Sequence, residues 1–245
     1  MIVDLAGKTA LVTGASRGIG LRLVERFIEA NAAKVYAVCI DGEGLAKLKE
    51  RLPQVETVQV DLSKWDETVE KLSPLDPVHA LVNCAGVVEY TKTGEVTEKA
   101  FDFHLDINTK ACLNVAQIVC NKLVATGQQG AVVNISSIAA QKHPPDHLAY
   151  SVSKAALDHL THVLAIDYGR HGIRVNSVNP TVVATPMGVK MWSDPAKSKP
   201  LLDRTPLGRF NTPDDIADVC LYLLSDKAAM LNGVILPVDG GYNLC

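Results

Sequence analysis

The sequence predicts an α/β domain built on a parallel β-sheet with helices on both faces. Short, β-branched apolar segments alternate along the chain with longer segments of helical period, and this alternation is typical of a doubly wound sheet. The chain has 245 residues, a length at which α/β folds routinely form one unit with one large core. We therefore expect a single domain over residues 1–245.

Seven apolar segments are the expected strands. Their near-continuous apolar character suits strands that are buried on both faces of a parallel sheet. In chain order they are residues 8–13, 34–40, 55–60, 78–83, 130–136, 173–178 and 233–238. Together with the helices between them, they predict a Rossmann-type fold with a seven-stranded parallel sheet.

Helical period marks six further segments: residues 19–31, 43–52, 65–72, 105–126, 150–169 and 213–225. One long stretch, residues 179–200, has neither pattern and is expected to be irregular. A loop of that length inside a compact domain is usually functional.

Composition and charge exclude several classes of function. Hydrophobic residues make up 47% and charged residues 21% of the chain, and the net charge is −3. This is the composition of an ordinary soluble protein, without the basic field that binds a polyanion. The N-terminal segment has no signal-peptide pattern, and no apolar run approaches the roughly 18 to 20 residues that cross a bilayer. We expect a cytoplasmic protein with no nucleic-acid partner and no membrane insertion.

Cysteines and histidines form no metal-binding pattern. The six cysteines, at positions 39, 84, 112, 120, 220 and 245, lack C-x-x-C spacing and mostly lie in apolar segments, which predicts reduced, buried thiols. Neither the 143/147 nor the 159/162 histidine pair has a third ligand at a suggestive spacing. We expect no metal site.

A glycine-rich turn follows the first expected strand. The segment TGASRGIG places Gly14, Gly18 and Gly20 between a strand and a helix. Glycines there permit positive φ and let the backbone approach a pyrophosphate, which the free N–H groups of the next helix bind. The spacing differs from G-x-G-x-x-G, and the turn alone is also compatible with a tight turn that holds no ligand.

Several motifs together resemble the short-chain dehydrogenase/reductase family, over essentially the whole chain. They are TGASRGIG, NCAG at 83–86, Asn108, Ser137 and YSVSK at 150–154. Segments 178–188, 192–195, 206–210, 223–226 and 240–245 are similar to a branch that reduces ketopentoses and α-dicarbonyl compounds. The resemblance implies a reductase of small carbonyl compounds that uses NADPH/NADP+, with NADH as the other possible cofactor.

The resemblance implies a role for each of four side chains. Tyr150 is expected to be the general acid/base, because ketone reduction needs a proton as well as the hydride of the nicotinamide. Lys154, one helical turn later, favours the phenolate and binds the nicotinamide ribose. Ser137 hydrogen-bonds the substrate oxygen, and Ser136 beside it is a structural hydroxyl. Asn108 kinks its helix and holds a water near the lysine.

The resemblance also assigns the residues that border the cofactor. Arg17 is placed to reach an adenosine 2′-phosphate, whereas Asp41 could instead bind a free 2′-hydroxyl; Ile40 stands where the resembled branch has an arginine. Because Asp41 lies beyond the last position of the strand and can point past the ribose, we expect Arg17 to determine the cofactor preference, in favour of NADPH. The predicted cofactor residues are Gly14, Ser16, Arg17, Gly18, Ile19, Gly20, Asp41, Asp61, Leu62, Asn83, Ala85, Gly86, Tyr150, Lys154, Pro180, Val183 and Thr185.

A hydroxylated carbon chain is expected to bind beside Tyr150. His147 and Trp192 would offer one hydrogen-bonding edge and one apolar wall, although His147 is also compatible with a surface turn and Trp192 with a core filler. The predicted substrate residues are Ser137, Ile138, Pro144, His147, Tyr150 and Trp192.

Two questions stay open at this stage. Cys84 replaces the second asparagine of the more usual N-N-A-G, which puts the contacts of that amide in doubt. An NAD(H)-linked dehydrogenase of another alcohol, ketone or acyl substrate, or a nucleotide-bound scaffold without turnover, is the alternative function.

The family commonly packs the helices at 105–126 and 150–169 across a two-fold axis, so we expect a homotetramer through Leu113, Ala116, Val119, Leu157, Leu160 and Leu164.

Overall fold

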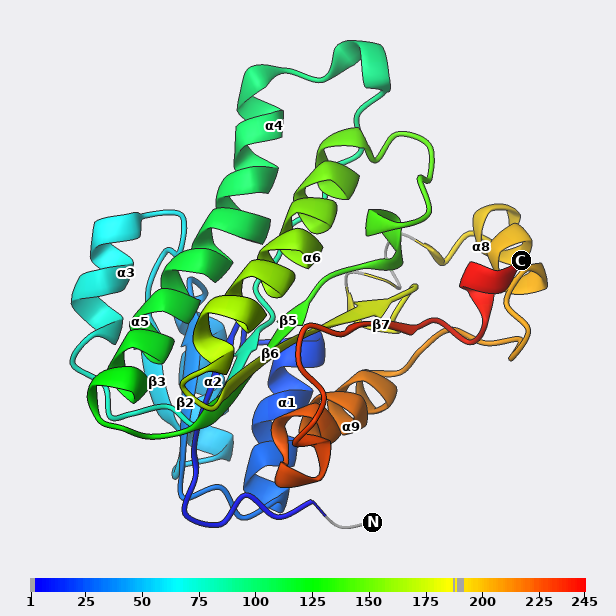
Figure 1. The fold of residues 1–245 in the computed structure, drawn as a ribbon. Helices are drawn as coiled ribbons and strands as arrows, with labels where there is room; N and C mark the ends of the chain where they lie inside the picture. The colour runs from blue at the N-terminus through cyan, green and yellow to red at the C-terminus, as the bar shows by residue number, and fades with distance from the viewer. Residues whose placement is uncertain (1–2, 187, 189–191) are drawn as a thin grey trace.

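A seven-stranded parallel sheet forms the centre of the protein in the computed structural model, which describes residues 3–186, 188 and 192–245 (Figure 1). The strand order is β3-β2-β1-β4-β5-β6-β7, and every neighbouring pair is parallel. The strands are β1 (Thr9–Thr13), β2 (Lys34–Cys39), β3 (Glu56–Gln59), β4 (Ala80–Asn83), β5 (Gly130–Ile135), β6 (Ile173–Pro180) and β7 (Ile235–Val238). The predicted fold class is confirmed.

The sheet has one point at which the direction of chain progression reverses. Ala10 of β1 pairs with Val35 of β2 on one side and with Ala80 of β4 on the other. The chain therefore leaves β1 toward β3 and later returns to build β4 through β7. In open parallel sheets, ligands bind in the crevice outside the carboxyl ends of the strands at such a switch point.

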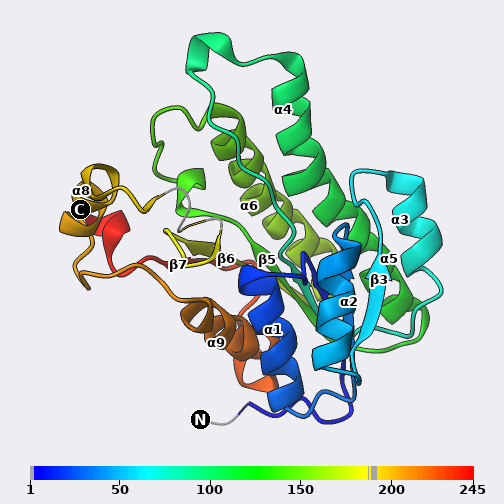
Figure 2. The same ribbon diagram turned by 180° about the vertical axis from the view of Figure 1, so that it is seen from behind.

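Helices cover both faces of the sheet (Figures 1 and 2). Alternation along β1 divides the core: Val12 packs with α1, α2 and α9, whereas Leu11 packs with the layer of α3, α5 and α6. The helices are α1 (Gly18–Glu29), α2 (Gly42–Arg51), α3 (Trp65–Leu72), α4 (Glu98–Leu105), α5 (Ala111–Ala125), α6 (Leu148–Gly169), α8 (Pro195–Asp203) and α9 (Pro213–Leu224).

Strand burial agrees with the prediction in the centre of the sheet and not at its edges. All residues of β1 and β4 are buried. In the edge strand β3, by contrast, Glu56, Thr57 and Gln59 are exposed, and β7 is half-buried throughout. Three of the four residues of β3 are polar, which suits a strand at the edge of the sheet.

The helix predicted over 105–126 begins earlier and is not continuous. Thr97 caps α4, its Oγ1 accepting a hydrogen bond from Ala100 N at 3.2 Å. A π-helical turn, η2 (Asp106–Lys110), then joins α4 to α5. The start was missed because α4 buries only one described side chain, His104, so its sequence carries little apolar period.

The stretch 179–200 is not irregular throughout. Asp194 caps α8 by accepting from Ala196 N at 2.9 Å, and Pro195 occupies the first turn, where proline is tolerated. Residues 187 and 189–191 of this stretch lie outside the described residues. α8 lies beside the C-terminal turn η5 (Tyr242–Leu244) in both views, and Arg204 stacks 4.9 Å from the Tyr242 ring centroid.

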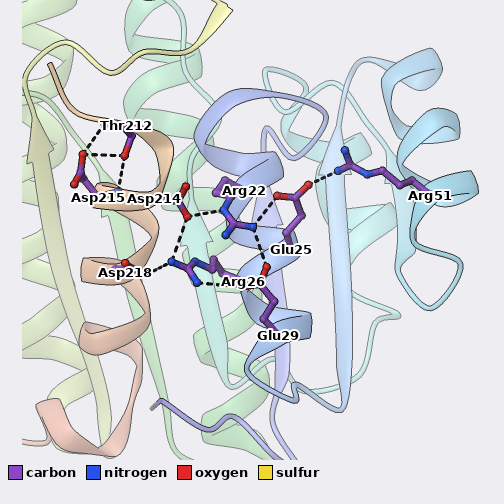
Figure 3. Close-up of polar contacts among 9 residues, drawn as sticks. All are labelled: Arg22, Glu25, Arg26, Glu29, Arg51, Thr212, Asp214, Asp215 and Asp218. Atoms are coloured by element: carbon purple, nitrogen blue, oxygen red, sulfur yellow. Dashed lines mark hydrogen bonds and ion pairs between the residues drawn. The ribbon is translucent and has the colours of Figure 1, made fainter. Parts of the chain in front are cut away.

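An ion-pair network joins α1 to α9 on the face away from α6 (Figure 3). Arg22 Nε lies 2.7 Å from Asp214, and Arg26 Nη2 lies 2.6 Å from Asp218. The network continues along α1 through Glu25 and Glu29 and reaches Arg51 of α2. Because the side chains of Asp214 and Asp218 are 50% and 62% exposed, each pair adds little stability by itself.

The cysteine prediction is confirmed in part. All six cysteines are free, and Cys39, Cys112, Cys120 and Cys220 are buried. Burial raises the pKa of the Cys112 thiol to about 11, so this thiol is protonated at neutral pH. The prediction is wrong for Cys245, which is exposed, and for Cys84, which is half-buried.

Candidate active site

A cavity of about 1050 Å³ opens at the carboxyl ends of the strands. Its walls come from the residues that directly follow β1, β4 and β5, from the end of β6, and from one face of α6. The topology brings these segments together, because the carboxyl ends of parallel strands lie along one edge of the sheet.

The glycine turn forms one end of this cavity. Gly14 has φ +67°, and a Cβ there would lie 2.9 Å from Ala85 Cα, so a side chain at position 14 would collide with the loop after β4. A Cβ on Gly20 would collide with the carbonyl oxygen of Gly14. The turn therefore requires glycine for close packing and leaves its backbone open toward the cavity.

The start of α1 is open to a ligand. Arg17 precedes the helix in an extended conformation, and its side chain makes no capping hydrogen bond. Gly18, Ile19 and Gly20, the first helical residues, line the cavity. Free N–H groups and the positive end of the helix dipole make this position an anion site.

The loop after β4 is fixed against β1 by one hydroxyl. Thr13 Oγ1 accepts hydrogen bonds from Cys84 N at 2.9 Å and from Ala85 N at 3.1 Å. Both contacts use the backbone of the N-C-A-G segment and are independent of the side chain at position 84. Asn83 lies behind the loop, 1% exposed, and donates through Nδ2 to Asn134 Oδ1 at 2.9 Å.

Tyr150 and Lys154 lie one turn apart on α6, and both line the cavity. The Lys154 Nζ is 5.9 Å from the Tyr150 ring centroid and donates to Ile135 O at 2.8 Å. Lys154 is only 4% exposed, so its ammonium charge is screened little by solvent. The ammonium therefore lies beside the Tyr150 ring in the wall of the cavity.

Ser137 faces the cavity at the end of β5. Its Oγ accepts a hydrogen bond from Ala139 N at 3.1 Å and so caps the short helix η3 (Ile138–Ala140). Because that bond uses a lone pair, the hydroxyl proton is left to donate to a substrate oxygen. Ser136 Oγ instead donates to Lys154 O at 3.2 Å inside the protein, which agrees with the structural role expected of it.

Asn108 lies at the centre of the π-turn η2 and is fully buried. Its Oδ1 accepts from Val87 N at 2.9 Å, and its Nδ2 donates to Val87 O at 3.0 Å and Ser153 Oγ at 2.9 Å. The amide thus ties the loop after β4 to α6. The helix is distorted at this residue, as expected, but Asn108 is not part of the described cavity lining.

The two side chains that were expected to compete at the cofactor ribose differ in their placement. Ser16, Arg17 and Ile40 line the cavity, whereas Asp41 is absent from its described lining. The Asp41 carboxylate caps α2, accepting from Gly44 N at 3.0 Å, and this bond holds its pKa below the ordinary value. Asp41 as a cofactor residue stays a prediction, and one of its two carboxylate oxygens is used by the helix.

The other predicted cofactor residues line the cavity, with Asn83 as a second exception. Those in the lining are Gly14, Ser16, Arg17, Gly18, Ile19, Gly20, Asp61, Leu62, Ala85, Gly86, Tyr150, Lys154, Pro180, Val183 and Thr185.

The predicted substrate residues also meet in this cavity: Ser137, Ile138, Pro144, His147, Tyr150 and Trp192 line it. The Nδ1 of His147 is hydrogen-bonded to Pro145 O, which leaves Nε2 for a ligand. Sequence reasoning missed Tyr90, whose ring centroid lies 4.5 Å from that of His147. Its position in the loop after β4, at the ligand-binding edge of the sheet, was the available signal.

Two further features, a metal-binding cluster and a membrane-spanning helix, are absent from the described residues. Within the described part of the chain, no group of three or more His, Cys, Asp or Glu side chains could hold a metal ion. Among helices of the described residues, none combines the length and apolarity needed to span a membrane.

Comparison with known proteins agrees with this geometry. A family model described as enoyl-(acyl carrier protein) reductase matches residues 14–243. The chain belongs to the short-chain dehydrogenase/reductase family and is an oxidoreductase. It is 47% identical to L-xylulose reductase of Bos taurus over 99% of each chain, and 43% identical to D-erythrulose reductase of Gallus gallus over 98% of this chain and 97% of that one.

Solved structures share the whole fold. A gluconate 5-dehydrogenase from Burkholderia cenocepacia, in complex with NADP and tartrate, matches with a TM-score of 0.94 at 28% identity. The match covers 100% of this chain and 98% of that one. The family predicted from the sequence motifs is thus confirmed.

Proposed function

We propose that the protein is an NADPH-dependent carbonyl reductase that converts L-xylulose to xylitol and also reduces small α-dicarbonyl compounds. The observation that carries the proposal is the meeting of Ser137, Tyr150 and Lys154 in one cavity with an open helix start. The relatives named for L-xylulose and D-erythrulose, both small ketoses, support the substrate class.

The residues at the glycine turn fit a nicotinamide dinucleotide phosphate. The backbone at Gly14 and the start of α1 are exposed to the cavity, as pyrophosphate binding requires. Arg17 lines the same end and offers a guanidinium to a 2′-phosphate. The structural relative that contains NADP supports this choice.

When bound, NADPH supplies the hydride that reduces the carbonyl carbon. The hydroxyl of Ser137 donates a hydrogen bond to the carbonyl oxygen, which gains negative charge as the reaction proceeds. The Tyr150 hydroxyl gives its proton to this oxygen and completes the alcohol. The Lys154 ammonium stabilises the phenolate that remains on Tyr150. Asn108 holds the loop at Val87 in register with α6.

The substrate wall combines a few polar groups with apolar surface. His147 Nε2 and Ser137 Oγ offer hydrogen bonds, while Ile138, Pro144 and Trp192 are apolar. A short polyol chain with one carbonyl group matches this combination. A panel of ketoses, α-dicarbonyls and acyl substrates, assayed with both cofactors, tests the substrate class.

Tyr150→Phe is the decisive test of the reaction. The variant removes only the transferable proton, so turnover is expected to fall below about 1% of wild type, in line with loss of an acid/base group. Affinity for NADPH, measured by fluorescence titration, should stay nearly unchanged.

Tyr168→Phe is the matched control, because Tyr168 lies on the same helix but bonds Asn121 away from the cavity. It should keep wild-type turnover. Full activity in the Tyr150 variant contradicts the proposed role. Cofactor binding without turnover in the wild type on every substrate would instead favour a nucleotide-bound scaffold.

We also propose a cytoplasmic homotetramer, although the residues first expected at its interface belong largely to the core. Ala116, Val119 and Leu164 belong to the core on this face of the sheet, Leu113 and Leu160 pack on it, and Leu157 is fully buried. A different apolar set on α6 is exposed: Val152 at 42%, Val163 at 42% and Ile166 at 72%. This exposed set supports assembly through α6.

A further inference from the structure

A buried carboxylate lies behind the active site, on the same helix as Tyr150 and Lys154. Asp158 is one turn beyond Lys154 on α6 and 9% exposed. Residues spaced by four share one face of a helix, so Asp158 continues the row that Tyr150 and Lys154 begin. Burial raises its pKa above the ordinary value. It does not line the described cavity and has no role in the reaction given above.

Asp158 holds two polar side chains of β6. Its Oδ2 accepts from Asn179 Nδ2 at 2.7 Å, and its Oδ1 accepts from Ser177 Oγ at 3.1 Å. The Ser177 hydroxyl also lies 2.8 Å from Asn179 Oδ1. All three side chains are buried, and burying a charge is costly unless it is hydrogen-bonded in this way.

The Asn179 amide connects this carboxylate to the catalytic segment. Its Nδ2 also donates to Ser137 O at 3.2 Å. A carboxylate can only accept hydrogen bonds, so Asp158 forces Asn179 to turn its NH₂ group toward α6. One N–H then bonds Asp158, and the second is left for the carbonyl oxygen of Ser137.

We propose that Asp158 is a positioning residue that fixes the orientation of Ser137 through Asn179. The hydrogen bond from Asn179 anchors Ser137 O and so restrains the peptide that follows it. This restraint keeps Ser137 Oγ facing the cavity, where it accepts from Ala139 N at 3.1 Å. The inference rests on the proposed function for its kinetic consequence, and on the contacts alone for its structural one.

The competing explanation is that Asp158 only joins α6 to β6. A pair of variants separates the two roles. Asp158→Asn removes the charge and turns one of the two acceptor oxygens into a donor, so Asn179 is no longer forced to turn its NH₂ group toward α6. The double variant D158N/N179D rebuilds a buried amide–carboxylate pair with the polarity reversed, but the new carboxylate has no N–H to give to Ser137 O. Asp167→Asn, an exposed aspartate of the same helix, is the control.

In Asp158→Asn, kcat for L-xylulose is expected to fall about tenfold or more, as a misplaced catalytic group does. KM and the NADPH dissociation constant should change less than about twofold, because no binding group is removed. Tm is expected to fall. In D158N/N179D, Tm should recover while kcat stays low. Asp167→Asn should match wild type. Recovery of kcat together with Tm in the double variant would reduce Asp158 to a structural role and overturn the proposal.

A second measurement needs no turnover. Hydrogen exchange of segment 136–140 reports on the Ala139 N–H that Ser137 Oγ accepts. Exchange there should be faster in Asp158→Asn and in D158N/N179D, and unchanged in Asp167→Asn. Unchanged exchange in both Asp158 variants contradicts the inference even if the wild type reduces no carbonyl compound. The latter result would contradict the proposed function alone.

Discussion

In the proposed function, the choice between NADPH and NADH depends on single side chains expected around the adenosine ribose. Arg17 faces the cavity, whereas the nearby carboxylate of Asp41 accepts the Gly44 N–H as the cap of α2. Because Oδ1 of Asp41 already accepts this hydrogen bond, we expect Asp41 to contribute less than Arg17 to binding at the ribose. This arrangement favours Arg17 as the residue that selects NADPH, and the assignment stays a prediction.

Arg17→Ala is expected to reduce kcat/KM for NADPH about 10- to 100-fold, because a charge-assisted contact is worth about 1.5–3 kcal/mol. Activity with NADH should change little, since NADH has no 2′-phosphate. Asp41→Ala is the matched control: it should leave the cofactor preference intact and cost about 0.5–2 kcal/mol of stability through the lost cap. A wild type that prefers NADH, or an Arg17 variant with unchanged preference, would contradict this assignment.

For single residues, sequence motifs predicted most of the side chains that line the cavity. They missed the side chains that hold or flank those residues. Tyr150, Lys154 and the glycines belong to short motifs whose spacing carries the chemistry. Asp158 and Tyr90 carry no such signal, because their roles depend on which strand and loop pack beside them. Asp41 is a related case: the sequence showed an acidic residue near the expected ribose site but not that its carboxylate caps α2.

Among the elements, α9 shows how local sequence fixes a helix start. Thr212 and Asp215 form a capping box, and Arg209 adds a bidentate ion pair to Asp215 at 2.6 and 2.9 Å. The Arg209 pair holds the pKa of Asp215 well below its ordinary value of 3.8. Since α9 packs on α1 and the sheet, loosening this start weakens one side of the core.

Asp215→Asn is expected to lower the free energy of unfolding at pH 7 by about 1 kcal/mol. A carboxylate with a depressed folded-state pKa stabilises above its unfolded pKa and loses that effect as pH falls through the folded value. The difference between wild type and variant should thus shrink below about pH 4. Urea unfolding at several pH values measures it. Asp203→Asn, which breaks an exposed pair with Lys199, is the control and should show no such trend.

Sequence period predicted the elements that bury apolar residues and missed those that do not. The seven strands and the helices that cover the sheet were all anticipated, with ends shifted by a few residues. The start of α4 and the whole of α8 were missed, because α8 buries none of its described side chains and α4 buries one. Their stability comes from the caps Thr97 and Asp194 and from tertiary position.

At the scale of the whole molecule, the exposed apolar face of α6 predicts assembly. Wild-type protein is expected to sediment as a tetramer of 26.3 kDa chains at micromolar concentration. Ile166→Glu places a charge on that face and should yield smaller species, because burying an unpaired carboxylate is unfavourable. Leu207→Glu, a change at a residue 71% exposed between α8 and α9, should leave the mass unchanged. A monomeric wild type would contradict the tetramer.

The strand order also has a consequence for the chain during its synthesis. Ala10 of β1 pairs with Val35 on one edge and with Ala80 on the other, so the second edge of β1 waits for a strand made 70 residues later. At the usual 5–20 residues per second, that edge stays unpaired on the ribosome for about 4–14 s. Until β4 emerges, the backbone N–H and C=O groups along that edge of β1 have no strand partner, and such an edge can pair with another chain.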